Sequence, residues 1–135
     1  MIEKYISTQK DLDDLIQSNF DGLIIIKDTK EEINIKENGK SLIDVSDSAQ
    51  IGSVSGSAQI GSVYDNGLLN IYSSLVTIKN ANNKAVLICY ENPKIIKKTK
   101  SVKIIKTTQY KENNFTIQKF IDIYAVEEKK EDLIL

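Results

Sequence analysis

The sequence predicts an all-β fold, a parallel β-solenoid in which short strands wind in successive coils around one aliphatic core. Three observations predict it: a nine-residue repeat, a long register of Ile and Leu in the same phase, and small residues at a fixed offset from that register. Together they cover residues 22–111, about ten nine-residue units. Internal repeats of a short period are typical of solenoids, because each unit buries its apolar face only against its neighbours.

The repeat is clearest in the middle of the chain. Ser48–Gly56 reads SAQIGSVSG and Ser57–Asp65 reads SAQIGSVYD, with seven of nine positions identical. A second pair has the same spacing: Lys94–Val102 reads KIIKKTKSV and Lys103–Lys111 reads KIIKTTQYK. The two pairs share no sequence, so their common period indicates a structural unit rather than a recent duplication alone.

Steps of nine from Ile51 meet Ile or Leu at every position: Ile24, Ile33, Leu42, Ile51, Ile60, Leu69, Ile78, Leu87, Ile96 and Ile105. Two residues earlier lie Gly22, Ala49, Ala58, Gly67, Val76 and Ala85, and three residues later lie Val45, Val54, Val63, Tyr72, Ala81 and Tyr90. An antiparallel meander, the alternative, has no reason to hold one phase over so many units. Two units would make an 18-residue coil with two sheets, and three would make a 27-residue coil with three sheets; both remain open.

The chain fits one domain, residues 1–135. Residues 1–21 are expected to form an N-terminal helical cap, with a helix at Ser7–Ile16 whose N-cap is Ser7 or Thr8. Leu12, Leu15 and Ile16 would then share one face. Residues 22–111 would form the solenoid. Residues 112–135 are expected to form a C-terminal strand cap and tail, because the exposed strand edges of a solenoid need cover.

Composition argues against an enzyme. The charge is balanced, with 18 Lys+Arg against 19 Asp+Glu, and the sequence contains neither His nor Arg. Without His there is no Ser-His-Asp or Cys-His pair and no His metal ligand. The single Cys89 cannot form an internal disulfide and is expected to be a buried structural thiol. We therefore expect no catalytic residue, no metal site and no cofactor.

We also expect no targeting signal in this sequence. The N-terminal stretch MIEKYISTQKDLDDL contains no apolar run, which argues against a signal peptide. Apolar runs such as Leu23–Ile26 are far shorter than a membrane span. A reducing cytoplasm, with no membrane partner, is the expected setting.

Candidate binding residues come from charge and aromatic patterning. Residues 84–111 contain eight Lys and one Glu, whereas residues 1–47 contain eleven acids and six Lys. The candidates are Lys94, Lys97, Lys98, Lys100, Lys103 and Lys106. These lysines would contact an acidic protein surface or a nucleic acid. Alternatively, they are solvated residues on outward strand positions that discourage edge pairing.

Three tyrosines complete the candidate set. Tyr72 and Tyr90 lie eighteen residues apart and would stack in an 18-residue coil, either as a recognition platform or as a structural ladder. Tyr64 interrupts the second clean repeat and is expected to be exposed.

The stretch SAQIGSVSGSAQIGSVYD resembles tandem nonapeptide repeats in uncharacterised phage proteins of low-GC bacteria. The close match covers Ser48–Asp65, and the flanks match by register alone. The resemblance implies a β-solenoid and a phage setting, and it carries no catalytic residue. The sequence departs from calcium-binding β-rolls, because it lacks their Gly-Gly-x-Gly-x-Asp pattern.

These observations favour a non-enzymatic protein-binding module: a phage-encoded inhibitor of a host antiviral defence protein, such as a CRISPR effector or its ribonucleoprotein, acting in the bacterial cytoplasm. Two alternatives stay open. One is a structural or assembly module of a phage particle, which would form homo-oligomers. The other is a nucleic-acid binder that uses the Lys94–Lys111 strip.

Overall fold

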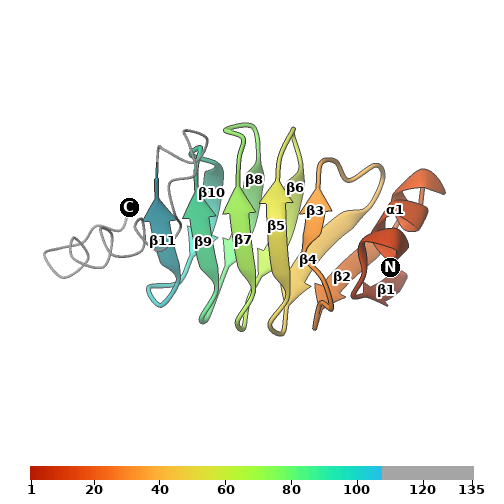
Figure 1. Cartoon of the computed structure of the whole chain (residues 1–135), viewed down its shortest axis with the longest axis horizontal. Coiled ribbons are helices and arrows are strands. Elements are labelled where there is room, and N and C mark those ends of the chain that lie inside the picture. Colours follow the sequence, from red (N-terminus) through yellow and green to blue (C-terminus); the bar gives the residue numbers. More distant parts are fainter. Residues whose placement is uncertain (108–135) are drawn as a thin grey trace, which may run out of the picture.

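A computed structural model of the chain describes residues 1–107, which form a β-solenoid of parallel strands with one short helix (Figure 1). The elements in chain order are β1 (Glu3–Ile6), α1 (Gln9–Gln17), β2 (Leu23–Lys27), β3 (Ile33–Ile35), β4 (Leu42–Ser46), β5 (Gln50–Val54), β6 (Gln59–Val63), β7 (Leu68–Ile71), β8 (Thr77–Ala81), β9 (Val86–Cys89), β10 (Lys94–Lys98) and β11 (Lys103–Lys106). The all-β, parallel solenoid expected from the sequence is confirmed.

Two sheets enclose the core. Sheet A has the order β1-β2-β4-β6-β8-β10, and sheet B has the order β3-β5-β7-β9-β11, with every strand pair parallel. From β2 onward successive strands alternate between the sheets, so one coil uses two strands. Ladder partners such as Leu69 and Leu87 are eighteen residues apart. The 18-residue coil with two sheets is therefore the arrangement that forms, with about six turns.

Aliphatic columns run through the stack from coil to coil. In sheet A one inward column is Ile24, Ile43, Ile60, Ile78 and Ile95; in sheet B its counterpart is Ile33, Ile51, Leu69, Leu87 and Ile104. The members from Ile24 to Leu87 are fully buried. Each such side chain contributes roughly 1.5–3 kcal/mol by leaving water. The register of Ile and Leu in the sequence thus becomes the main stabilising element of the fold.

The constant step of nine is wrong at three positions. Ile43 rather than Leu42, Ile95 rather than Ile96, and Ile104 rather than Ile105 occupy the inward columns. Leu42 is 38% exposed and Ile96 is 54% exposed. The segment between the β3 and β4 core positions is one residue longer than the repeat, and the turn between β9 and β10 is one residue shorter. Successive core residues are therefore nine residues apart, without a break, from Ile51 to Leu87.

The small residues two positions before each core residue behave as expected. Ala49, Ala58 and Ala85 are completely buried at the corners where the chain passes from one sheet to the other. The column three positions later is only partly as expected. Val54, Val63 and Ala81 point inward, whereas Ile71 and Cys89 replace Tyr72 and Tyr90 in the ladder. The ladder shifts by one residue at β5–β7, which accounts for the change.

Polar side chains form hydrogen bonds with backbone groups where the register of the ladder shifts. At the shift between Ile43 and Asp44, the Asp44 carboxylate accepts a 2.9 Å hydrogen bond from the Ser62 backbone N–H. Gly61 makes room for this contact, because a Cβ there would lie 2.7 Å from the Asp44 Oδ1. At the shift between β5 and β7 the Asn70 amide donates to the Ile51 carbonyl at 3.0 Å. Partly buried backbone groups thus keep hydrogen-bond partners where the strand pairing is irregular.

The N-terminal region contains the expected helix and an additional strand. Helix α1 starts after Thr8, whose hydroxyl accepts a hydrogen bond from the Asp11 backbone N–H at 3.3 Å, so Thr8 rather than Ser7 is the N-cap. Leu12 is buried in the core, and Leu15 and Ile16 pack against it. Strand β1 was not expected: it pairs with β2, so the parallel sheet begins before residue 22.

The other end of the chain is described only as far as Thr107. The expected C-terminal strand cap and tail at 112–135, and the last four residues of the expected solenoid, lie outside the described residues. Within residues 1–107 no helix is long and apolar enough to span a bilayer.

Candidate functional site

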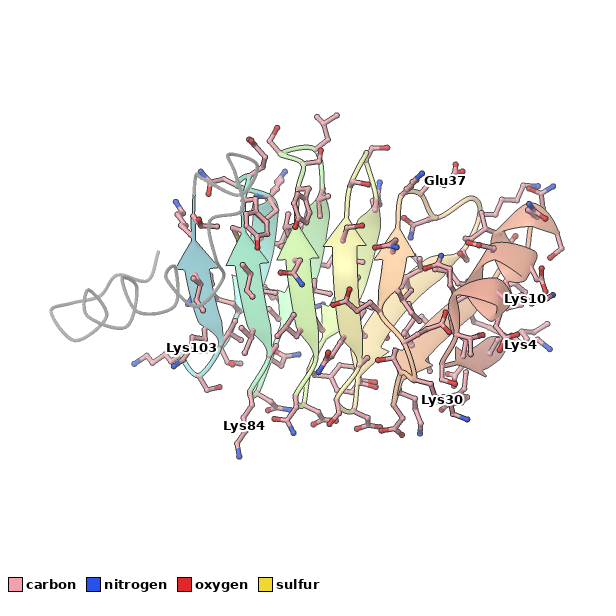
Figure 2. The ribbon with its side chains drawn as sticks, viewed as in Figure 1. Lys4, Lys10, Lys30, Glu37, Lys84 and Lys103 are labelled. Atoms are coloured by element: carbon pink, nitrogen blue, oxygen red, sulfur yellow. The ribbon has the colours of Figure 1, made fainter. Side chains whose placement is uncertain are left out.

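All six candidate lysines lie on the last described coil, which we call the basic end. Lys94, Lys97 and Lys98 belong to β10, Lys100 lies in the following turn, and Lys103 and Lys106 belong to β11. Five are exposed and Lys106 is half-buried. Lys103 points away from the stack, at the opposite end from Lys4 and Lys10 (Figure 2). The uneven charge of the sequence therefore becomes an uneven charge along the solenoid axis.

Two of these lysines occupy inward columns. Lys98 is the ladder partner of Ala81, in the column of Ile26, Val45 and Val63. Lys106 is the ladder partner of Cys89, in the column of Ile35, Val54 and Ile71. The six lysines therefore do not all occupy outward ladder positions, although Lys98 is exposed. In each sheet the second inward column ends in a lysine at the basic end: Lys98 in sheet A and Lys106 in sheet B.

Tyr72 and Tyr90 stack as the 18-residue spacing predicts. Their ring centroids lie 4.4 Å apart and the ring planes differ by 24°. Tyr90 is 7% exposed, while Tyr72 is half-buried. The pair is thus mainly a packing feature along the edge of the solenoid that carries the turns after sheet B.

Tyr64 does not join this pair. It follows β6, a strand of sheet A, and the turns after sheet A strands form the opposite edge of the solenoid. Its side chain is half-buried rather than exposed. The three candidate tyrosines therefore do not form one surface.

A row of polar residues that the sequence did not reveal lies along the same edge of the solenoid as Tyr64. Asp28, Asp47, Asp65 and Asn83 each follow a sheet A strand and each has a positive φ, between 44° and 58°. Asp and Asn tolerate this left-handed conformation better than other side-chain-bearing residues. The 18-residue steps from Asp47 to Asp65 to Asn83 are the signal that could have revealed the row.

One carboxyl group in this row, that of Asp65, has a raised pKa. A hydrogen bond shared with Asp47 raises the pKa of the Asp65 carboxyl, and the Asn83 amide, 3.4 Å from Asp65 Oδ1, opposes that rise. The residues line a groove of about 720 Å³ together with Ser48, Asn66 and Lys84. Across residues 1–107, no group of three or more acidic or Cys side chains is arranged to hold a metal ion.

Cys89 is 3% exposed and lies in the core. Burial raises the pKa of its thiol to about 11, although the charge of Lys106 acts in the other direction. The side chain is therefore a protonated thiol at neutral pH, which is the state of a structural cysteine rather than of a nucleophile.

The comparisons with known proteins add no relative. No family model, curated protein or solved structure matches this chain. The candidate site consequently rests on its geometry: a rigid stack of parallel strands with acidic residues over its first coils and lysines on the basic end. Such an arrangement can bind an anionic surface in one orientation.

Proposed function

We propose that this protein is a non-enzymatic protein-binding module whose basic end contacts an acidic surface on its partner. The observation that carries the proposal is the gathering of six lysines on one coil. Within the described residues, Lys94, Lys97, Lys98 and Lys100 take part in no ion pair, because the two salt bridges there join Lys10 to Asp14 and Lys27 to Asp47. These charges are therefore available to a partner.

The scaffold supports a binding role. Strands of the inner coils are hydrogen-bonded on both sides, and their inward side chains are almost completely buried. A surface held this firmly loses little conformational freedom on association, so more of its contact energy appears as affinity. Opposite charges at the two ends also orient the encounter.

The ends of the stack have a proposed role of their own. Gln9 of helix α1 pairs with the backbone of Asn34 on the outer edge of β3, through bonds of 2.6 and 3.0 Å. We assign to α1 the function of an N-terminal cap, since it occupies the edge where another strand would pair. Ten coiled units closed by two caps remain the complete architecture we propose.

The proposed partner class follows from the repeat. The likeness of Ser48–Asp65 to phage nonapeptide repeats supports a phage origin, and a small module without catalytic residues suits a stoichiometric inhibitor. We therefore place its target among host antiviral defence proteins in the bacterial cytoplasm, with a CRISPR effector or its ribonucleoprotein as the foremost candidate.

The test is an affinity purification of the tagged protein from a low-GC bacterium with active CRISPR loci, with and without nuclease. We expect one defence protein to be recovered in both conditions, and the triple charge reversal Lys97→Glu, Lys98→Glu, Lys103→Glu to abolish its recovery. The matched control reverses Lys4, Lys30 and Lys40, which are also exposed but lie in the first coils. Equal loss in both triple variants would reject the basic end as the contact surface.

The two alternative functions predict different outcomes. Loss of every partner on nuclease treatment would indicate a nucleic-acid binder, whose affinity should also fall steeply with salt. Recovery of the bait alone, as a large assembly, would indicate a structural module. The geometry disfavours end-to-end assembly, because stacking another copy on β10 would bury Lys98 against an apolar column.

A further inference from the structure

The basic end contains a cavity whose chemistry is distinct from that of the outer lysines. It measures about 340 Å³ and lies between β10 and β11. Its lining residues are Cys89, Asn92, Pro93, Ile95, Ile96, Lys98, Ile104 and Lys106. We call it the end cavity. Cavities of this size hold a few side chains or a small ligand.

The floor of the end cavity is the last layer of the core. Ile95 and Ile104 end the two aliphatic columns, and Cys89 lies one coil below Lys106. In every earlier coil the next strand covers such a layer, but among residues 1–107 no strand follows β10 in sheet A or β11 in sheet B. Cys89 and Ile104 are only 3% and 4% exposed, whereas Ile95 is half-buried and Ile96 is 54% exposed. The side of the cavity formed by Ile95 and Ile96 therefore presents apolar surface that a cover would bury, as the inner layers are buried.

The lysines that line the end cavity favour an occupant with carboxylates. Lys98 and Lys106 stand in inward ladder columns and both line the end cavity, Lys98 exposed and Lys106 half-buried. An apolar cover without acids would leave two partly desolvated cations unpaired, which is costly. A cover that brings carboxylates would instead form charge-assisted hydrogen bonds with them.

We propose that the end cavity is a peptide-binding site and that its occupant is the chain's own segment 112–135. This segment combines the two required chemistries. It contains six acids, Glu112, Asp122, Glu127, Glu128, Glu131 and Asp132, against three lysines, Lys119, Lys129 and Lys130. It also contains Phe115, Ile117, Phe120, Ile121 and Ile123 within a short stretch.

Connectivity favours this occupant over a separate molecule. The chain continues for 28 residues after Thr107, whereas one coil of the solenoid uses 18. Tethering raises the effective concentration of a segment to about the millimolar range. A separate peptide of similar sequence would have to exceed that concentration to compete.

A second copy of the chain is a poorer occupant. Its sheet A begins with β1, in which Lys4 holds the same ladder column as Ile24. Parallel stacking of that strand on β10 would carry Lys4 onto the apolar column that ends at Ile95, next to the existing lysines. The outer edge of β3 is already occupied by Gln9.

Disulfide trapping in the full-length protein tests the proposal. A Cys89→Ala background removes the native thiol. Ile96→Cys then places a thiol on the lining of the end cavity, and Leu75→Cys, the matched control, places one on a turn outside it; the two positions are 54% and 68% exposed. Each is combined with Ile121→Cys and oxidised at low protein concentration.

We expect the pair with Ile96→Cys to form an intramolecular disulfide at least about tenfold faster than the pair with Leu75→Cys. Adding Lys98→Glu and Lys106→Glu should bring the two rates together. Equal rates without those reversals would overturn the proposal, and so would a disulfide that links two chains, which would assign the cavity to a second copy. No partner is present in this experiment, so its failure would leave untouched the proposed partner contact of the basic end, which the reversal of Lys97, Lys98 and Lys103 tests separately.

Discussion

The side-chain amide of Gln9 takes the place of a neighbouring strand for the backbone of Asn34. It accepts from the Asn34 N–H at 2.6 Å and donates to the Asn34 carbonyl at 3.0 Å, at the outer edge of sheet B. One residue of the helix thereby satisfies both polar groups of an edge residue in β3.

Gln9→Met keeps the length of the side chain but removes both hydrogen bonds with Asn34, together with the 2.9 Å bond that the Gln9 amide donates to Asp13 Oδ1. We expect the free energy of unfolding to fall by about 1 kcal/mol, since the two bonds are exposed. Urea unfolding followed by circular dichroism measures the change. Gln17→Met, in the last turn of the same helix, is the matched control; a loss as large as that of Gln9→Met would mean that the Asn34 contact contributes nothing specific.

The corrected register gives a second prediction from two adjacent residues. Ile43 is fully buried and Leu42 is 38% exposed. Ile43→Ala should lower the free energy of unfolding by about 2–5 kcal/mol, whereas Leu42→Ala should change it by only about 0.5 kcal/mol. If denaturant unfolding showed the larger loss for Leu42→Ala, the constant nine-residue phase would be right and the observed ladder wrong.

The stacked tyrosines give a third prediction. A double-mutant cycle with Tyr72→Ala and Tyr90→Ala should return a coupling energy of about 0.5–1.5 kcal/mol, because the rings contact each other directly. The cycle of Tyr64→Ala with Tyr90→Ala is the control, and its effects should add within about 0.5 kcal/mol. Additive effects in the first cycle would show that the stack contributes no energy.

The raised pKa of Asp65 predicts a pH dependence of stability. Because the folded state raises this pKa above the usual 3.8, the contribution of Asp65 is fully present below pH 3.8 and is lost as the pH rises through the folded pKa. Asp65→Asn keeps a donor for Asp47 at every pH. We therefore expect its stability relative to the unchanged protein to increase as the pH rises through this window.

Urea unfolding at a series of pH values measures this difference. Asp21→Asn is the control, since Asp21 is an exposed aspartate that precedes β2, outside the row. Parallel pH curves for Asp65→Asn and the unchanged protein would disprove the link between Asp47 and Asp65.

Burial of Cys89 gives a prediction about reactivity. With a thiol pKa of about 11, the alkylation rate of the native protein by an uncharged maleimide should rise about tenfold per pH unit throughout the range from pH 7 to pH 10. The protein unfolded in urea should react much faster at pH 7. A rate that levels off near pH 9 in the native protein would contradict the burial of the thiol.

The sequence was a good guide to whatever depends on regular stacking. The buried core residues at steps of nine from Ile51 to Leu87 and the alanines at the corners follow from the nine-residue period, and so does the contact of Tyr72 with Tyr90. These features repeat because each coil meets the same neighbours as the one before it.

What the sequence did not reveal depends on breaks in that regularity. The longer loop before Leu42 and the shorter turn before Ile95 each move the phase by one residue, and a period alone does not show where a loop absorbs the difference. Strand β1 was missed because its Glu3, Lys4 and Tyr5 are exposed and show no apolar alternation. The inward direction of Lys98 and Lys106 became visible only once the shifted register was known.

The two near-identical repeats build opposite walls of the molecule: Ser48–Gly56 supplies β5 of sheet B, and Ser57–Asp65 supplies β6 of sheet A. Recombination between their gene sequences would delete nine residues, which is half a coil. Every later strand would then change sheets, and the tyrosine pair would move to the other edge relative to helix α1. Loss or gain of 18 residues would keep both edges in place. The length of this protein is therefore expected to evolve in whole coils, even though its visible genetic unit is half of one.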